Sequence, residues 1–593
     1  MNAVSTPKLA RGFALLGTAL LLTAPARAQT PAWQWGLQTQ NLAPTDGTVA
    51  AGNAVATDAA GRLYVGGSYG EDTNGTAVAA RTLPGAGTLG PGRGGFVAQA
   101  TAAGQWAWVT PVLSLGAAAG GRARASVTNL VATTAGDVYA TGYVEGTGVQ
   151  VGGLTRPLGS AGGALFVARL NSAGVCQWLQ TADDIATLPS VALDPSTGGV
   201  VVAGTYRGSP SIGGTALPPG TSLNGEAVFV ARLSAAGQWL GAVGATGSAG
   251  VISGLGLAVG PAGQVAVSSS RSGGTLTFGA YSLTTPATSD EIFVVAQLSP
   301  VNQWQWAVGG STDYNRTFGA AYTATGALWV AGRGQAGTVV GPLTLGAPGA
   351  PVANTYSGFL GQLSPAGQWG TVRQLTPSAP GLAVFAALAV DAAGNALATG
   401  ALAGNNGAVQ AQLGSETLMA TNQRLLFFVA GLSAGGQLRY VATVPPAALR
   451  FGLTPAGIAL DGGNGALYLT GTLTGALTLG TSQLMGSYAA NGSTGGDAFV
   501  GKLINATALT ARPGTAAPVL ACYPNPARTA ATLRLPAPTP EPRTATLADA
   551  LGREVRRQPV PARATSATLD LAGLAPGLYL VRCGAAAGRL MVE

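Results

Sequence analysis

Two hydrophobic patterns alternate along the chain and predict β-strands throughout. One is an apolar Phe-Val-Ala-x-Leu run followed by a short turn and Gln-Trp. Its copies begin at Phe96, Phe166, Phe229, Val294, Phe359, Phe428 and Phe499. The other is a pair of apolar runs around a Gly turn, and its copies begin at Ala54, Leu130, Val191, Leu257, Ala320, Leu388 and Ile458. Strand-forming runs broken by a Gly turn are typical of hairpins. Each unit therefore predicts four strands in a meander, with a Gly-rich excursion between the second and third.

The spacing of the units favours a ring of sheets. The run ends at Ala100, Leu170, Leu233, Leu298, Leu363, Leu432 and Leu503, which are 63 to 71 residues apart. Blades of β-propellers have four strands and span about 40–50 residues, so these units fit blades with enlarged loops. A β-helix would have a much shorter period, and separate sandwich domains would each begin and end on whole strands.

The array begins and ends in the middle of a unit. The Gln-Trp half stands alone at Ala32–Trp35, and the last Phe-Val half stands alone at Phe499–Leu503. A ring of sheets has to hide its first and last edges, because open edges invite aggregation. The sequence therefore predicts an all-β fold in which residues 29–503 form a seven-bladed β-propeller closed by N- and C-terminal strands. Deletion of Trp33–Gly36 should destabilise the whole ring.

The hairpin pattern also resembles a known repeat family. The stretch Leu388–Asn395 reads LAVDAAGN. It is similar to the SBBP family of bacterial β-propeller repeats, and the resemblance covers residues 29–503. The fourth and fifth copies lack the Asp. The resemblance implies an exported bacterial propeller.

Residues 1–28 are expected to be a signal peptide. Lys8 and Arg11 precede the apolar stretch Phe13–Leu22, which is too short to span a bilayer as a stable helix. Ala26 and Ala28 are the small residues that a signal peptidase requires, so cleavage is expected after Ala28. No later segment is long and apolar enough to cross a membrane.

The C-terminal part predicts a second domain. Residues 504–517 have the composition of a linker, and residues 518–593 contain short strand-like runs that fit a small immunoglobulin-like β-sandwich. Its motif residues are Tyr523, Pro524, Asn525, Pro526, Gly552, Gly577 and Tyr579.

These residues resemble the type A C-terminal sorting domain of the type IX secretion system of Bacteroidota. The resemblance implies that the secretion machinery handles residues 518–593. The protein would then be secreted or held at the outer-membrane surface, and anchoring and release both stay open. Arg589 replaces the usual Lys of the last strand, and Glu593 replaces the usual basic end.

Composition removes several classes of function. The formal net charge is +8, but residues 29–503 carry 17 basic and 17 acidic residues. The repeats therefore have no basic excess for nucleic acid. The chain has no His, which excludes Ser-His-Asp systems and His-bearing zinc sites. Its two lysines, Lys8 and Lys502, do not follow a phosphate-binding loop. No cofactor is expected.

Three sets of residues allow a functional and a structural interpretation. Asp58, Asp194, Asp391 and Asp461 recur at the hairpins, either as calcium ligands or as caps of their own turns, and the second is favoured. Nine of the ten Trp lie on the Gln-Trp strand, which favours packing between units over sugar binding. Cys522 and Cys583 could form a disulfide or stay free, and Cys176 is expected to be packed.

The sequence predicts an exported, non-catalytic protein that binds a glycan or a protein. One alternative is a polysaccharide-active propeller enzyme that uses carboxylates, and another is a structural component of a surface layer. Convergent carboxylates in a central channel would favour the enzyme, whereas a channel lined by apolar residues or Gly would favour the binding module. Ligand specificity is expected where the repeats differ, in the long loops at 70–95, 115–125, 403–424 and 481–497.

Overall fold

The structure is a computed structural model. It describes residues 31–42, 49–71, 80–116, 123–159, 163–219, 226–248, 250–285, 291–310, 315–346, 355–405, 407–421, 425–444, 454–487, 495–506, 520–535, 541–549, 553–583 and 586–593. These residues form 51 strands and no helix, so the fold is all-β, as predicted. The chain divides into two compact units, Gln29–Leu509 and a C-terminal unit that contains Thr510–Glu593. The residues described contain no helix of the length and apolarity needed to span a membrane.

In the first unit, one antiparallel path of four strands recurs seven times, and we number these repeats 1 to 7. The first strands are β3 (Val49–Thr57), β9 (Arg124–Ala132), β15 (Ile185–Leu193), β22 (Val251–Val259), β28 (Arg316–Tyr322), β34 (Gly381–Val390) and β40 (Thr454–Leu460). The second strands are β4 (Leu63–Glu71), β10 (Val138–Glu145), β16 (Val200–Tyr206), β23 (Val265–Ser272), β29 (Leu328–Gln335), β35 (Ala396–Gly404) and β41 (Leu467–Leu473).

The other two strands of each path come from the Phe-Val and Gln-Trp runs. The third strands are β7 (Gly94–Ala100), β13 (Gly163–Leu170), β19 (Ala227–Leu233), β26 (Glu291–Leu298), β32 (Tyr356–Leu363), β38 (Leu426–Leu432) and β44 (Asp497–Ile504). The fourth strands are β8 (Trp106–Leu115), β14 (Cys176–Asp183), β20 (Trp239–Gly244), β27 (Trp304–Gly309), β33 (Trp369–Pro377), β39 (Leu438–Val444) and β1 (Ala32–Gln38). A strand buried on both faces reads as a continuous apolar run, and every residue of β7, β19 and β38 is buried.

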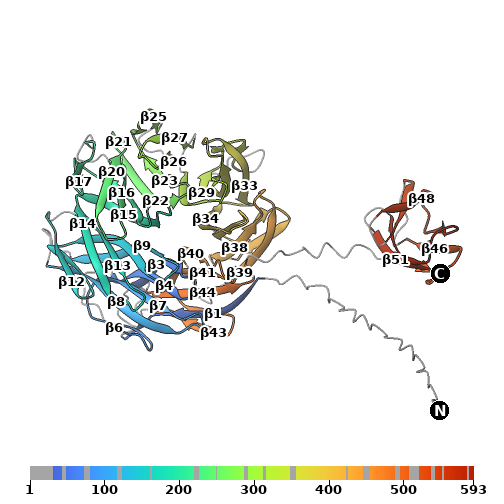
Figure 1. Ribbon diagram of the computed structural model, residues 1–593, viewed down its shortest axis with the longest axis horizontal. Helices are drawn as coiled ribbons and strands as arrows, with labels where there is room; N and C mark the ends of the chain where they lie inside the picture. Colours follow the sequence, from blue (N-terminus) through green and yellow to red (C-terminus); the bar gives the residue numbers. More distant parts are fainter. Residues whose placement is uncertain are drawn as a thin grey trace, which may run out of the picture. The chain divides into compact units, whose positions relative to one another are not determined.

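The beginning of the chain completes the last repeat. β1 pairs antiparallel with β44, with Leu37 opposite Val500 and Gly36 opposite Gly501. The repeats follow one another around a central opening, so that the blue start of the array lies beside its orange end (Figure 1). The pairing of the two ends that the sequence predicts is therefore present.

A hairpin arm lies between the second and third strands of each repeat. The arms are β5 (Arg81–Leu83) and β6 (Gly87–Leu89), β11 (Gly148–Val151) and β12 (Leu154–Pro157), β17 (Ser211–Ile212) and β18 (Thr215–Ala216), β24 (Thr275–Phe278) and β25 (Tyr281–Thr284), β30 (Val339–Val340) and β31 (Leu343–Thr344), β36 (Val409–Leu413) and β37 (Glu416–Ala420), and β42 (Ala476–Leu479) and β43 (Ser482–Met485). Several arms also pair with the preceding repeat. β11 pairs with β8, β36 with β33, β24 with β21 (Thr246–Gly247), and β5 with β2 (Gln40–Asn41).

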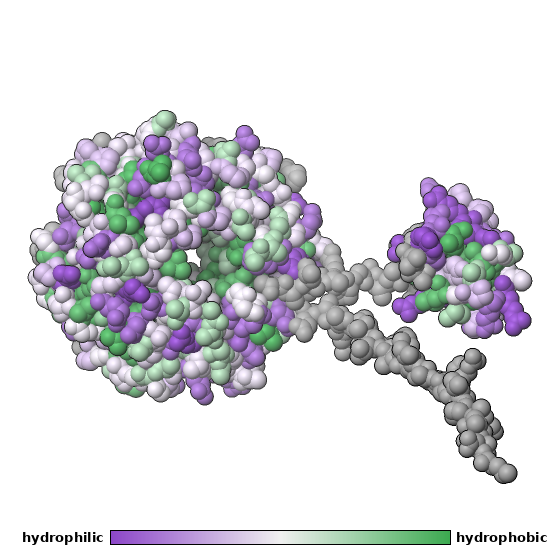
Figure 2. Space-filling model, in the orientation of Figure 1, coloured by the Kyte–Doolittle hydropathy of each residue, from purple (hydrophilic) through white to green (hydrophobic). Residues whose placement is uncertain are grey.

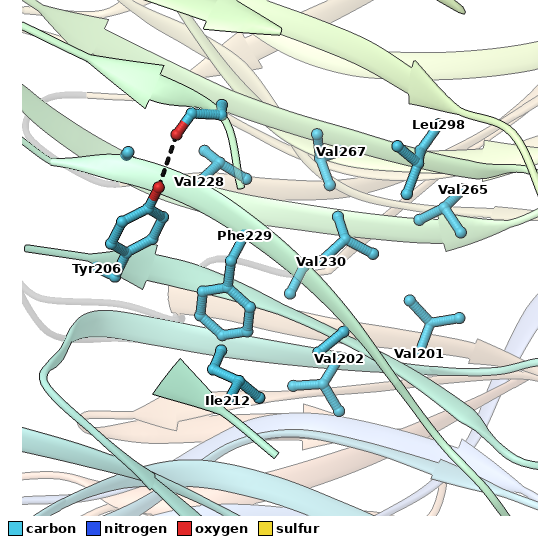
Figure 3. Packing of buried hydrophobic residues seen from close by; sticks show 14 of the residues in the cluster. Val201, Val202, Tyr206, Ile212, Val228, Phe229, Val230, Val265, Val267 and Leu298 are labelled. Atoms are coloured by element: carbon cyan, nitrogen blue, oxygen red, sulfur yellow. Dashed lines mark hydrogen bonds between the residues drawn. The ribbon is translucent and has the colours of Figure 1, made fainter. Parts of the chain in front are cut away.

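Apolar side chains from adjacent repeats share one core. Between repeats 3 and 4, Val230 of β19 and Val267 of β23 are each about 1 % exposed and belong to the same cluster (Figure 3). The Tyr206 hydroxyl donates a hydrogen bond of 2.8 Å to the carbonyl of Ala245, which satisfies a buried phenol (Figure 3). The repeats therefore support each other through their faces, so that neighbours are energetically coupled.

In three repeats the Gln-Trp strand bonds to the following repeat through an indole. The indole of Trp178 in repeat 2 donates to the carbonyl of Ala235 in repeat 3 over 3.0 Å. The indoles of Trp108 and Trp306 make the equivalent bond, in each case to the repeat that follows their own. The structure thus confirms packing between repeats for these three Trp. Repeat 5 has Thr371 at this position, and there Trp329 of β29 donates to Gly394 of repeat 6 instead.

The turn glycine beneath each indole gives a test of this contact between repeats. Gly237 has φ of 81°, and a Cβ there would lie 2.7 Å from Trp178 Cδ2. We expect Gly237→Ala to lower the free energy of unfolding by about 2–4 kcal/mol, because left-handed strain and overpacking add. Gly198 has φ of 67° and no atom within 4 Å of its Cβ position. The control Gly198→Ala should therefore cost only about 1–2 kcal/mol. Equal losses in urea unfolding would contradict the contact between repeats.

The C-terminal unit has two sheets around one core. The first contains β45 (Ala521–Tyr523), β46 (Ala530–Arg534) and β49 (Ser566–Asp570). The second runs in the order β48 (Glu554–Val560), β47 (Arg543–Ala548), β50 (Gly577–Cys583) and β51 (Ala586–Val592). Leu533 and Leu569 of the first sheet share a buried cluster with Leu547 and Val581 of the second. Two sheets that enclose one core are the arrangement of a β-sandwich.

Candidate functional site

The motif Tyr523–Pro526 is attached to the last strand of the chain. The Asn525 side chain donates from Nδ2 to the carbonyl of Arg589 over 2.9 Å and accepts from the amide of Met591 over 2.8 Å. Pro524 and Pro526 each follow a cis peptide bond. The Tyr523 side chain is about half exposed. The Asn525 side chain thus makes the two hydrogen bonds that a neighbouring strand would make to β51, and these bonds hold the turn against that strand.

The other described motif residues lie on β50, the strand that precedes β51 and pairs with it. Gly577 opens β50 opposite Val592, and Tyr579 pairs with Leu590. The Tyr579 ring is buried, and its hydroxyl donates to the carbonyl of Ala575 over 2.7 Å. The structure therefore brings together all the described parts of the motif around the C-terminal strand. Gly552, and the expected cleavage residues Ala26 and Ala28, lie outside the described residues.

The terminal contacts of β51 were not anticipated from the motif. The amide of Ala527 donates to Met591 O, and the amide of Glu593 donates to Ala527 O, both over 2.9 Å. These bonds extend the attachment begun by Asn525. The last strand itself was expected from the sequence, but its bonding to the Asn525 turn was not, because the two are more than 60 residues apart along the chain.

The first unit has a central cavity of about 570 Å³, lined by all seven first strands. Figure 2 shows an opening in this unit with apolar residues at its edge. The wall consists of small and aliphatic residues such as Leu193, Leu257 and Ile458, with a few amides and hydroxyls. None of the described lining residues carries an ionisable side chain, so the wall supplies no general acid or base.

The polar groups of this wall tie neighbouring repeats together. Asn53 Nδ2 donates to Val127 O over 2.8 Å, which joins repeats 1 and 2. Ser190 Oγ donates to Leu255 O over 3.1 Å, which joins repeats 3 and 4. Thr57 Oγ1 does the same with Leu460 O over 3.3 Å, between repeats 1 and 7. These polar side chains therefore already have hydrogen-bond partners in neighbouring repeats.

Seven described acidic side chains of this unit are paired with arginines. The described pairs are Asp58–Arg62, Asp137–Arg169, Glu145–Arg124, Asp194–Arg232, Glu226–Arg207, Glu291–Arg316 and Asp497–Arg81. Each of these carboxylates thus has a guanidinium as its charge partner.

The hairpin Asp residues cap their own turns. Asp391 Oδ1 accepts from the amides of Ala393 and Asn395 over 3.0 and 2.8 Å. Asp58, Asp194 and Asp461 accept from their turns in the same way. Burial raises the pKa of Asp194, but bonds from Ser196 and the Arg232 guanidinium outweigh it, and its pKa lies below the usual value. No group of three potential metal ligands occurs in the described ranges. The hydrogen bonds that these four Asp accept from their own turns confirm the turn-cap interpretation.

The three cysteines are buried free thiols, so Cys522 and Cys583 are not joined. Burial raises the pKa of Cys176 to about 11, against a weaker lowering effect of its hydrogen bond at Trp178. Burial also raises the pKa of Cys522 and Cys583.

We expect the folded protein to give almost no reaction with Ellman's reagent in mildly alkaline buffer, because the reactive thiolate is disfavoured and shielded. After unfolding in guanidinium without reductant, all three thiols should react. A single reactive thiol would instead reveal a Cys522–Cys583 disulfide, and rapid reaction of the native protein would contradict the burial of the thiols.

Comparison with known proteins identifies the C-terminal unit. Residues 521–592 match the family model described as a secretion system C-terminal sorting domain. No curated protein matches the chain.

Among solved structures, a protein of unknown function from Dyadobacter fermentans is 10 % identical. It has a TM-score of 0.39, over 79 % of this chain and 98 % of that one. A second is titled a PL25 polysaccharide lyase, an ulvan lyase bound to a glucuronate–sulfated rhamnose unit. It is also 10 % identical, with a TM-score of 0.37 over 75 % of this chain and 95 % of that one.

The two solved structures are too distant to carry an argument, and the resemblance of the repeats to the SBBP family stays a prediction. The C-terminal match is different, because the Asn525 turn, the Tyr579 strand and β51 all lie within it. The chain thus ends in a type IX secretion C-terminal sorting domain, and the protein is exported for secretion or for attachment to the cell surface.

Proposed function

We propose that residues 29–503 form a seven-bladed β-propeller that acts outside the cell as a non-catalytic binding module for a glycan or a protein. Seven four-strand paths around one opening, with the last path completed by β1, support the propeller (Figure 1). Export of the protein places such a module where extracellular ligands are met.

The observation that carries the proposal is the composition of the central wall. An active site that cleaves a polysaccharide needs a proton donor and a base or nucleophile. The described residues of the wall provide none, and their amides and hydroxyls bond to neighbouring repeats. The first unit therefore has the features of a rigid scaffold that presents its ligand surface elsewhere.

A glycan array probed with the protein purified from residue 29 onward tests this function. Binding to a defined set of glycans, with dissociation constants in the range of about 1 µM to 1 mM, is expected. The bound glycans and bulk polysaccharides should yield no new reducing ends or unsaturated products after long incubation. Product release that a single carboxylate substitution abolishes would overturn the proposal and favour an enzyme.

A further inference from the structure

A groove on the outer surface lies where the first and last repeats meet. Its volume is about 700 Å³. One wall contains Gly36–Gln38 of β1 and Gln483–Met485 of β43. The other contains the tip of the repeat 1 arm at Pro84 and Gly85, and Gly104–Trp106 of the following turn. The groove is therefore built by both ends of the array.

The groove is open because the arm of repeat 1 pairs with β2 and not with β1. At the junction of repeats 1 and 2, β11 pairs with β8 along four residue pairs, from Gly148–Leu115 to Val151–Val112. At the closing junction, β5 pairs with β2 of the preceding repeat through two residue pairs, Gln40–Thr82 and Asn41–Arg81. β1 itself pairs with β44. The arm tip thus stands beside β1 across a gap, and the wall glycines add no side chain to fill it.

The groove combines neutral hydrogen-bonding groups with apolar surface. Gln40, Gln105 and Gln483 are exposed, and their side-chain amides make no hydrogen bond to another described residue. Met485 is 67 % exposed on one rim, and Pro84 is exposed on the opposite side.

The other polar side chains of the groove already have hydrogen-bond partners within the protein. Gln38 donates to Met485 O and accepts from Met485 N, both over 2.7 Å. The Trp106 indole donates to Gln38 O over 3.2 Å and forms part of the floor. The three exposed amides are therefore the groups available to a ligand.

We propose that this groove binds a neutral oligosaccharide. Each amide offers both donors and an acceptor to sugar hydroxyls, while Met485, Pro84 and the edge of Trp106 contact the apolar face of a sugar ring. None of the lining residues is ionisable, so the groove has no partner for a uronate or a sulfate. Its volume lies within the range of sites for small ligands. This inference rests on the proposed binding function, and it assigns the ligand-binding site to the groove.

Methionine oxidation gives a direct readout of occupancy. Met485, Met419 and Met591 are 67, 52 and 41 % exposed, so dilute hydrogen peroxide should oxidise all three. The probes are cellohexaose, laminarihexaose, mannohexaose and, as an anionic comparison, hexagalacturonate. We expect at least one neutral hexasaccharide to slow the oxidation of Met485 by more than about fivefold while Met419 and Met591 are unchanged. Mass spectrometry of tryptic peptides measures the three rates in one sample.

Two variants separate this groove from other surfaces. Gln105→Ala with Gln483→Ala removes two amides, and should weaken binding of the same hexasaccharide at least about tenfold in calorimetry. Met419→Ala is the matched control, because Met419 occupies the equivalent arm strand of repeat 6, and it should change binding less than about twofold.

The outcomes distinguish failure of the groove assignment from failure of the proposed binding function. Hexasaccharide binding that leaves Met485 unprotected and the double variant unaffected would overturn the groove but leave the binding module standing. Tighter binding of hexagalacturonate than of every neutral probe would also overturn the groove. If no neutral hexasaccharide binds below about 1 mM, the groove assignment fails. Cleavage of the probes would overturn the non-catalytic function itself.

Discussion

Deletion of Ala32–Gln38 is expected to unfold the whole of Gln29–Leu509, with a loss of more than about 5 kcal/mol in the free energy of unfolding. The deleted strand supplies six residue pairs to β44 and the buried indole of Trp35. Trp35 packs against the turn at Gly104 and lies 5.9 Å from the Tyr468 ring. The deletion therefore removes a contact between repeats 1 and 7 as well as one strand.

A loss of this size is comparable to the whole stability of a typical domain. The deletion also exposes β44 as an open edge, which favours aggregation. Circular dichroism melting and size-exclusion chromatography measure both effects. A synthetic peptide of residues 29–42 should restore part of the lost stability by adding the missing strand. An unchanged melting midpoint in the deletion variant would show that β1 does not close the unit.

The second large effect is expected at the buried ion pair of the same junction. Arg81 on the arm of repeat 1 contacts the Asp497 carboxylate of β44, and both side chains are at most 1 % exposed. Asp497 also accepts from the amide and hydroxyl of Ser487 over 2.6 Å, and from Thr39 Oγ1 over 3.4 Å. This carboxylate therefore joins four segments of chain at the seam.

Arg81→Met should lower the free energy of unfolding by about 3–5 kcal/mol at neutral pH, because it leaves a buried carboxylate without its cation. The double variant Arg81→Met with Asp497→Leu should be less destabilised than the sum of the two single variants. Urea unfolding of all four proteins gives this double-mutant cycle. Strict additivity would contradict a coupled pair.

The pH dependence of Arg81→Met has a definite sign. Burial raises the pKa of Asp497 in the native protein, while Arg81 and Ser487 act against it. Without Arg81 the folded pKa rises further above the unfolded value, so the folded state binds more protons than the unfolded one. The deficit relative to the native protein should therefore shrink as the pH falls towards the folded pKa of Asp497. A deficit that grows on acidification would argue against a buried, unpaired carboxylate.

The local patterns of the repeats were sufficient to predict their strands. Each Phe-Val run became a buried third strand, and each hairpin Asp became a turn cap, because both depend on residues close together in sequence. The pairing of β1 with β44 was also predictable, since the two halves of one repeated phrase stand at opposite ends of the array.

Features that depend on distant partners were not predictable. Arg81 and Asp497 are 416 positions apart, and neither stands at a position that recurs with the same residue in the other repeats. Trp329 lies outside the Gln-Trp strand, yet it makes an inter-repeat bond at the junction where Thr371 replaces the usual Trp. The groove depends on the pairing of β5 with β2, and no motif in the sequence marks that pairing. In the C-terminal unit the motif marked Asn525 but not its partners on β51.

A cysteine cross-link between the two ends tests the closed arrangement most directly. Leu37 lies opposite Val500, so Leu37→Cys with Val500→Cys should form a disulfide in the oxidised, folded protein. Val429 occupies the equivalent position on the third strand of repeat 6, and it provides the control pair Leu37→Cys with Val429→Cys. Mass spectrometry under non-reducing conditions should find the peptide containing position 37 joined to the one containing position 500, and no link between positions 37 and 429. Absence of the 37–500 link, or formation of the 37–429 link, would contradict closure of the unit by its first and last strands.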